Sequence, residues 1–387
     1  MVLSDSPALR AERKRVMTSA VTGKIPSRRL GRCGIDVSAV GVGCWPIGGP
    51  DHNLGMPMGW SDVDEASAVA GLERAFELGA NLFDTADVYG HGRSERLLGR
   101  LVAQVDRDAV VLTSKVGYFA GTARHGYQPR HMRSQLEQSL ENLGVDHLDI
   151  YFLHHSDFGP DDRYLDGAVE VMRGFKAQGR IRAVGMRGPH RFAVDRLNTP
   201  PELRGDKIER FRALFDTVQP DVLAVRDNLL TPNDRSAGIF ALADAHDCGV
   251  LVNKPLGQGL LTGSYQPGCP RMFGHGDHRS RKRWFGPGAI PLIAEGLDRL
   301  RELVGPEPAD LIRIALWAGL VRSPRTAVLV GFTSPEQVSI NLTCLGERPD
   351  PSTVGAARSI MAEVQAQLDA GGQVFIDDLT GAAGTPQ

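Results

Sequence analysis

The stretch Leu148-Asp149-Ile150-Tyr151-Phe152-Leu153-His154 is typical of a buried β-strand that ends in a polar residue. Asp84 follows the short apolar segment 80–83, and Lys115 stands at the end of another, 110–114. In a barrel of parallel strands, side chains at the C-terminal ends of strands that are distant in sequence meet at one rim. If the fold is such a barrel, we therefore expect Asp84, Lys115 and His154 to lie close together.

Segments of strand-like and helix-like sequence alternate along most of the chain. Eight short segments rich in Val, Ile and Leu are candidate strands, at residues 40–43, 80–83, 109–114, 148–153, 181–186, 221–226, 249–253 and 327–330. Segments of helical periodicity lie between or after them, at 63–79, 94–104, 130–143, 166–178, 207–217, 234–247, 290–303, 308–320, 335–346 and 352–370. Most strand ends recur every roughly 30 to 40 residues, the length of a right-handed βα unit. The sequence predicts an α/β fold, a (β/α)8 TIM barrel with extra C-terminal helices.

The predicted domain organisation is a mobile N-terminal arm at 1–27, one barrel domain at 28–371 and a C-terminal tail at 372–387. A β-hairpin is expected to open the barrel domain. Residues 255–290 are rich in Gly, Pro, His and Arg, and a loop of that size over a barrel mouth is usually a lid or a binding element. We expect the basic residues 279–283 to be solvated and Trp284 and Phe285 to pack this loop down.

Composition excludes several classes of partner. The 387 residues carry a net charge of -2, with 23% charged and 42% hydrophobic residues, and lack the basic excess that nucleic acid or an anionic membrane favours. Five cysteines without a CxxC motif fit a reducing cytoplasm. Neither a membrane-length apolar run nor a secretory signal is evident in the sequence. We expect a cytoplasmic protein with a small-molecule substrate and neither nucleic-acid nor membrane partner; the oligomeric state stays open.

Tyr89, five residues after Asp84, completes a set of residues suited to carbonyl chemistry. Reduction of a carbonyl by hydride transfer requires a proton donor for the developing alkoxide. The pKa of a tyrosine is about 10, and a nearby ammonium group would lower it by favouring the phenolate. Lys115 can supply this charge, Asp84 can hold Lys115, and His154 can donate to the same oxygen or relay a proton. These four residues are the predicted catalytic residues.

The same residues resemble the aldo-keto reductase family. The resemblance is carried by residues 83–90 with Ser94-Glu95 and Leu98-Gly99 behind them, by 113–115 and by 148–154, and it extends from about residue 29 to 341. It implies a (β/α)8 barrel that binds NADP(H) without a Rossmann domain. In this family Tyr89 would be the general acid.

The resemblance also implies a cofactor site. Residues 254–261 are similar to a loop that folds over the pyrophosphate, where glycines allow close backbone approach. Residues 331–337 with Asn341 are similar to the segment that receives the adenosine. We expect NADP(H) rather than NAD(H), although members that hold the 2'-phosphate with Lys and Arg have them where this chain has Gly331 and Gln337. The predicted cofactor contacts are Gly43, Cys44, Arg187, Gly188, Pro255, Leu256, Gly257, Gly259, Gly331, Thr333, Gln337 and Asn341.

The expected nicotinamide pocket departs from the family pattern. Arg187-Gly188 replaces Ser-Asn after the fifth strand, and Ala224 and Asp227 replace Gln and Tyr on the sixth. Since the four catalytic candidates are intact, the changes indicate an altered site rather than a decayed one. Either Asp227 pairs with Arg187, or it faces a cationic substrate such as an amino sugar; pairing is favoured, because an unpaired buried carboxylate is costly.

Trp45, Tyr118, His155 and Asp227 are the candidate substrate contacts, and no metal site is expected because the His and Asp clusters lack further ligands at useful spacing. The predicted function is an NAD(P)(H)-dependent oxidoreductase that interconverts a carbonyl and an alcohol on a polar small molecule, sugar-like or a secondary metabolite. One alternative is a redox epimerase without net cofactor use. Another is a cofactor-binding accessory or sensor subunit, like the potassium-channel β subunits that share this fold.

Overall fold

The structure is a computed structural model, and it describes residues 25–53, 55–61, 63–189, 205–372 and 374–375. Most of the predicted N-terminal arm and of the predicted C-terminal tail therefore lies outside the described residues.

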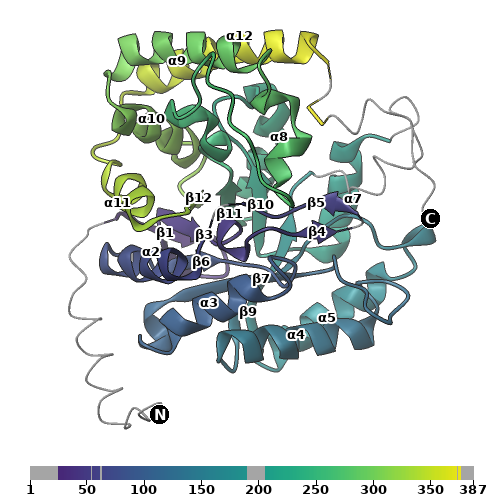
Figure 1. Cartoon of the computed structure of the whole chain (residues 1–387). Helices are drawn as coiled ribbons and strands as arrows, with labels where there is room; N and C mark the ends of the chain where they lie inside the picture. The colour runs from purple at the N-terminus through teal and green to yellow at the C-terminus, as the bar shows by residue number, and fades with distance from the viewer. Residues whose placement is uncertain (1–24, 54, 62, 190–204, 373, 376–387) are drawn as a thin grey trace, which may run out of the picture.

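Eight parallel strands form a closed barrel (Figure 1). They are β3 (Val40–Gly43), β6 (Leu82–Asp84), β7 (Val111–Val116), β8 (Leu148–Leu153), β9 (Ile181–Arg187), β10 (Val222–Arg226), β11 (Gly249–Asn253) and β12 (Thr326–Gly331). Strand β12 pairs with β3 and β10 with β9, so the sheet closes on itself. The predicted (β/α)8 barrel is confirmed, and each strand lies within about two residues of its predicted bounds.

Helices follow the strands around the outside of the barrel, as the sequence predicts. These are α2 (Glu65–Glu77), α3 (Arg93–Val102), α4 (Pro129–Leu143), α5 (Leu165–Ala177), α7 (Lys207–Val218), α8 (Asn233–Ala245) and α11 (Pro335–Thr343). The extra helices α9 (Ile290–Val304), α10 (Pro308–Leu320) and α12 (Pro351–Ala370) pack together on one side of the barrel (Figure 1). Within the described residues, no helix combines the length and apolar composition needed to cross a membrane.

The N-terminal end of the barrel is closed by a hairpin of β1 (Ser27–Leu30) and β2 (Ile35–Ser38). Leu30, Ile35 and Val37 pack in one buried cluster with side chains from inside the barrel, including Leu82, Ile150, Phe152, Ala183, Val222, Leu251 and Leu329. The barrel interior is therefore a filled core, as is usual for this fold. Only the opposite end, where the strands finish, is left for a binding site.

Two segments that are far apart in sequence cover this open end. The first is a short hairpin, β4 (His52–Asn53) and β5 (Met56–Pro57), which the sequence did not reveal. The second is the long loop after β11, which forms the 3-10 turns η5 (Gly257–Thr262), η6 (His278–Arg281) and η7 (Arg283–Phe285). Gly59, just after the hairpin, joins it to the long loop by two backbone hydrogen bonds. Its amide donates to the Gly276 carbonyl at 2.9 Å, and its carbonyl accepts from the His278 amide at 3.0 Å.

Arg279, Arg281 and Lys282 of this loop are buried and Arg283 is partly buried, which corrects the expectation that the basic residues 279–283 would be solvated. Arg279 is 3% exposed. Its guanidinium donates to Asp277 Oδ2 at 2.6 Å and lies 3.9 Å from the ring centre of Trp60, so an acid and an aromatic ring offset its burial. Trp284 and Phe285 are buried as predicted.

Candidate active site

The site is built by the inward-facing residues at the C-terminal ends of the strands. Side chains alternate along a strand. The inward-facing residues in the middle of each strand fill the barrel core, and the inward-facing residue at its C-terminal end points into the mouth. Around the barrel these residues are Gly43, Asp84, Lys115, His154, Arg187, Arg226, Asn253 and Gly331. All eight line one cavity of about 1310 Å³. This common level explains why residues from eight separate segments meet.

Asp84 and Lys115 form a buried ion pair at the bottom of the cavity. Lys115 Nζ donates to Asp84 Oδ2 at 2.8 Å and to the Thr85 carbonyl at 2.5 Å. The Thr113 hydroxyl donates to the other oxygen, Asp84 Oδ1, at 2.6 Å. Since both carboxylate oxygens are engaged, Asp84 holds the ammonium group of Lys115 in a fixed position.

Tyr89 lies over this ion pair, on the loop between β6 and α3. Lys115 Nζ is 4.8 Å from the ring centre of Tyr89, and the ring of His154 is 6.0 Å from it. The loop is held close to the segment before β4, where a side chain on Gly48 would place its Cβ 2.8 Å from the carbonyl carbon of Tyr89. The four residues predicted from the sequence therefore lie together.

The protonation of Tyr89 differs from the sequence prediction. Burial raises the pKa of Tyr89 above its ordinary value, and Lys115 only partly opposes this effect. Burial disfavours the charge on Lys115, yet the charges of Asp84 and Tyr89 keep the pKa of Lys115 above its ordinary value. The pair at neutral pH is thus an ammonium group and a neutral phenol, which is the form that can donate a proton.

Aromatic side chains form the wall beside Tyr89. Trp45 and Tyr118, two of the predicted substrate contacts, line the cavity. The ring of Trp45 lies 6.3 Å from that of Tyr89, and its indole nitrogen donates to the Met58 carbonyl at 2.9 Å. The ring of Tyr118 is 4.6 Å from that of His154.

His155, another predicted substrate contact, does not line the cavity. Its Nε2 lies 2.9 Å from the Gly117 carbonyl, and the Tyr127 hydroxyl donates to the His155 carbonyl at 2.8 Å. Burial lowers the pKa of His155 to about 4. The prediction is wrong because His154 takes the inward position at the end of β8, and the next residue faces the opposite side. His155 instead supports the loop that carries Tyr118.

Asp227 also faces away from the cavity. It is 0% exposed and lies among Ser236, Arg322 and Arg358, which belong to or follow the surrounding helices. Arg358 donates to Asp227 Oδ2 at 3.0 Å, Arg322 Nε lies 3.5 Å from the same oxygen, and the Ser236 hydroxyl donates to Oδ1 at 3.2 Å. Both earlier hypotheses, a pair with Arg187 and a contact with a cationic substrate, are therefore wrong.

Most of the predicted cofactor contacts line the cavity, namely Gly43, Arg187, Gly188, Pro255, Leu256, Gly259, Gly331, Thr333, Gln337 and Asn341. Cys44 does not, because its side chain is buried in the core and its amide donates to the Asp84 carbonyl at 2.8 Å. Gly257 does not either, because at this residue the chain turns into η5 with a φ of 60°. Gly257 borders a small neighbouring pocket instead.

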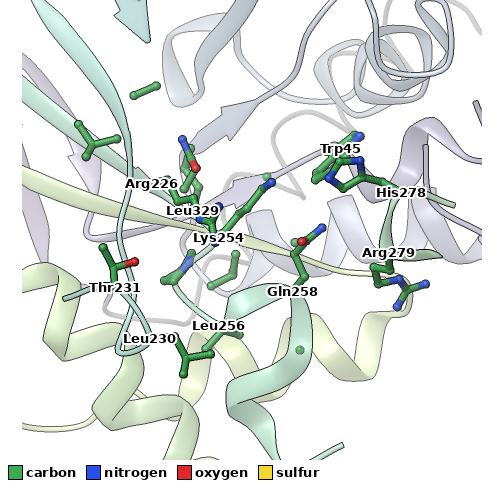
Figure 2. A pocket seen from close by; sticks show the side chains of 18 of the residues that line it. Trp45, Arg226, Leu230, Thr231, Lys254, Leu256, Gln258, His278, Arg279 and Leu329 are labelled. Carbon is green, nitrogen blue, oxygen red and sulfur yellow. The ribbon is translucent and has the colours of Figure 1, made fainter. Parts of the chain in front are cut away.

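Several cavity residues were not named among the predicted contacts, although Lys254 and Gln258 belong to the segment 254–261 that the sequence assigned to the pyrophosphate. Figure 2 shows Arg226, Lys254 and Gln258 around the cavity, with Trp45 and His278 on one side. The alternation Val222, Ala224, Arg226 on the sixth barrel strand could have placed Arg226 inside the mouth. No local signal could have placed His278 there, because its position depends on how the long loop folds back over the mouth.

The cavity wall is basic and suits an anionic dinucleotide. Eight of its described lining residues are Lys or Arg and three are Asp. Helix α11 begins at this wall with Ser334 as its N-cap, and a helix N-terminus favours an anion. The volume exceeds the roughly 300–1,000 Å³ of a usual ligand pocket, which leaves room for a dinucleotide and a small substrate together. Among the described residues, no group of three or more His, Cys, Asp and Glu side chains could hold a metal ion.

Comparisons with known proteins agree with this architecture. The model of the aldo/keto reductase family matches residues 39–360. An NADH-specific methylglyoxal reductase of Escherichia coli K12 is 29% identical over 335 residues, which cover 83% of this chain and 93% of that protein. An L-galactose dehydrogenase of Arabidopsis thaliana is 26% identical and covers 89% and 95% of the two chains. The structure of a glycerol dehydrogenase of Gluconobacter oxydans has a TM-score of 0.66 at 25% identity, covering 87% and 95%. The chain belongs to the aldo/keto reductase family of oxidoreductases.

Proposed function

We propose that this protein is an NAD(P)(H)-dependent oxidoreductase that interconverts a carbonyl and an alcohol on a polar small molecule, with Tyr89 as the general acid and base. The observation that carries the proposal is the position of Tyr89 in the cavity, 4.8 Å from the Lys115 ammonium that Asp84 holds. A neutral phenol next to a fixed ammonium group can give up its proton, because the phenolate that results is stabilised by the positive charge.

The four residues divide the proton chemistry among them. When bound, the dinucleotide supplies or accepts the hydride. In reduction, Tyr89 donates its phenolic proton to the carbonyl oxygen, and Lys115 stabilises the phenolate left behind. His154 donates a hydrogen bond to the same oxygen, which stabilises its developing negative charge. In oxidation, the Tyr89 phenolate accepts the proton of the alcohol.

A polar, small substrate suits the part of the cavity next to Tyr89. Trp45, Trp60 and Tyr118 give it aromatic walls, while Ser61 and His154 add polar groups. The three relatives named above are a methylglyoxal reductase, an L-galactose dehydrogenase and a glycerol dehydrogenase. Their names support a short, oxygen-rich substrate for this chain.

The preference for NADP(H) over NAD(H) stays a prediction. A 2'-phosphate would lie at the start of helix α11, where Thr333 and Gln337 line the cavity. Neither is charged, and the Gln337 side-chain oxygen accepts from the Thr333 amide at 2.9 Å. A fluorescence titration with NADPH and NADH tests the prediction; equal affinity, or tighter binding of NADH, would contradict it.

Replacement of Tyr89 by Phe tests the proposed acid. We expect turnover to fall by about a hundred-fold or more, since the proton donor is lost, while the Kd of the cofactor stays within a few-fold of the wild-type value. Tyr164→Phe is a matched control, because it removes a hydroxyl group from a residue outside the cavity. Normal turnover in Tyr89→Phe would overturn the assignment. Cofactor binding by the wild type without turnover on any sugar, ketone or aldehyde would overturn the enzymatic function.

A further inference from the structure

Two arginines stand at the rim on neighbouring strands. Arg187 ends β9 and Arg226 ends β10, and Arg187 pairs in register with Ala224. Both line the cavity. The nearby carboxylate of Asp227 does not neutralise them, because it faces the outside of the barrel and is engaged by Arg358.

The surroundings of the two arginines differ. The guanidinium of Arg226 lies 5.6 Å from the ring centre of Trp284, under the long loop. Next to it, Lys254 Nζ lies 4.7 Å from the ring centre of Trp45 (Figure 2). Arg226 therefore belongs to the loop-covered half of the cavity, where a dinucleotide would be enclosed, whereas Lys254 lies beside Trp45.

Arg187 belongs to the half of the cavity where the carbonyl would react. In the β8–β9 register Leu153 lies opposite Met186, so the next residues, His154 and Arg187, reach the rim at the same level. Burial, Lys115 and Asp84 have the larger effects on the pKa of Tyr89, and the charge of Arg187 acts to lower it by a smaller amount. The guanidinium is thus close enough for its charge to act on the proposed acid.

The wall offers Arg187 no acidic partner. Among the described residues, Arg187 forms no ion pair, and the carboxylates that line the cavity are Asp84, Asp206 and Asp369. Asp84 is engaged by Lys115, Asp369 pairs with Arg235, and Asp206 caps helix α7. Ala224, which lies in register with Arg187 and lines the same cavity, has only a methyl side chain and leaves space for a ligand at the guanidinium.

We propose that Arg187 binds an anionic group of the substrate, a carboxylate or a phosphate, close to the reacting carbonyl. The guanidinium fork matches both anions in a bidentate geometry. This proposal rests on the proposed function and narrows it: the preferred substrates are oxo acids or phosphorylated hydroxyaldehydes rather than neutral sugars. Arg187 is then a specificity-determining residue, and Tyr89 remains the proton donor.

The test compares matched substrates in Arg187→Gln and the wild type. Succinic semialdehyde is paired with butanal, and glyceraldehyde 3-phosphate with glyceraldehyde. In the wild type we expect kcat/KM to favour the anionic member of at least one pair, and the pair affected shows whether the site prefers carboxylate or phosphate. In Arg187→Gln this preference falls about tenfold or more, because KM rises more for the anionic members of the pairs than for the neutral ones. Arg187→Lys should keep part of the preference.

Arg133→Gln is the control for a lost positive charge, since Arg133 lies exposed on helix α4 outside the cavity. An equal loss on neutral and anionic substrates in Arg187→Gln would overturn the proposal, because Arg187 would then act on Tyr89 or on the cofactor. No preference for an anion in the wild type would overturn it as well.

A binding experiment separates this proposal from the proposed function. Butyrate and glycerol 3-phosphate, which carry no aldehyde or ketone group, are titrated by calorimetry into the protein saturated with NADPH. Binding by the wild type that weakens about tenfold in Arg187→Gln supports the anion site even if turnover is absent. If neither compound binds to the wild type, or if both bind equally to the variant, the proposal fails while the oxidoreductase function can still stand.

Discussion

Asp227 accepts a hydrogen bond from Arg358 of helix α12, with 3.0 Å between Oδ2 and Nη2. The carboxylate is 0% exposed and also lies 3.5 Å from Arg322 Nε. Adjacent residues of one strand end thus have separate tasks: Arg226 lines the cavity, and Asp227 ties the barrel to the C-terminal helices. Asp227, which replaces the tyrosine of the family pattern, is therefore buried outside the cavity, and its carboxylate is paired with arginines there.

Asp227→Asn should destabilise the protein and leave substrate recognition unchanged. Loss of the carboxylate leaves the positive charges of Arg322 and Arg358 uncompensated, at a cost of about 3 kcal/mol. Urea unfolding measures this cost, and Asp234→Asn on the exposed start of helix α8 is the control. We expect KM for amine-bearing and neutral substrates to stay the same in the folded variant. A tenfold rise in KM for the amines alone would place Asp227 in the substrate site after all.

The rate of reduction should be independent of pH around neutrality as far as Tyr89 is concerned. Burial raises the pKa of Tyr89 above its ordinary value of about 10, so the proton needed for reduction is present between about pH 6 and 9. It is lost only as the pH rises through the raised pKa. Oxidation needs the phenolate and should therefore accelerate with pH. Profiles of kcat/KM in both directions measure this; a decline in reduction with an apparent pKa near 7 would point to His154 as the acid instead.

His155 should make the protein less stable in mild acid. Burial lowers its pKa from 6.5 to about 4, so the folded protein holds the imidazole neutral while the unfolded chain protonates it. The part of the free energy of unfolding that depends on the neutral imidazole is fully present above pH 6.5 and is lost as the pH falls toward 4. The loss amounts to about 3 kcal/mol. In His155→Gln the free energy of unfolding should be lower at pH 7.5 but should fall less between pH 6.5 and 4. Denaturant unfolding at several pH values tests this, and an unchanged pH dependence would exclude His155 as the source.

Local patterns in the sequence were sufficient to predict the barrel and its four candidate catalytic residues. A strand buried on both faces needs a continuous apolar run, and a polar residue at its C-terminal end lies at the rim of the barrel. Asp84, Lys115 and His154 could therefore be placed from their own neighbours. The hairpin at residues 52–57 has strands of only two residues, too short for any periodicity to appear.

What the sequence by itself determined is thus the order of strands and helices, and the chemistry that meets at the strand ends. Only the tertiary structure decided whether a residue just past a strand end faces the cavity or the surrounding helices, and which side chain it contacts there. Arg358 is 131 residues from Asp227 in sequence, and His278 reaches the mouth only because a long loop folds back over it. The protonation of Tyr89 was decided in the same way, since burial, which depends on the whole fold, outweighs the neighbouring charge of Lys115.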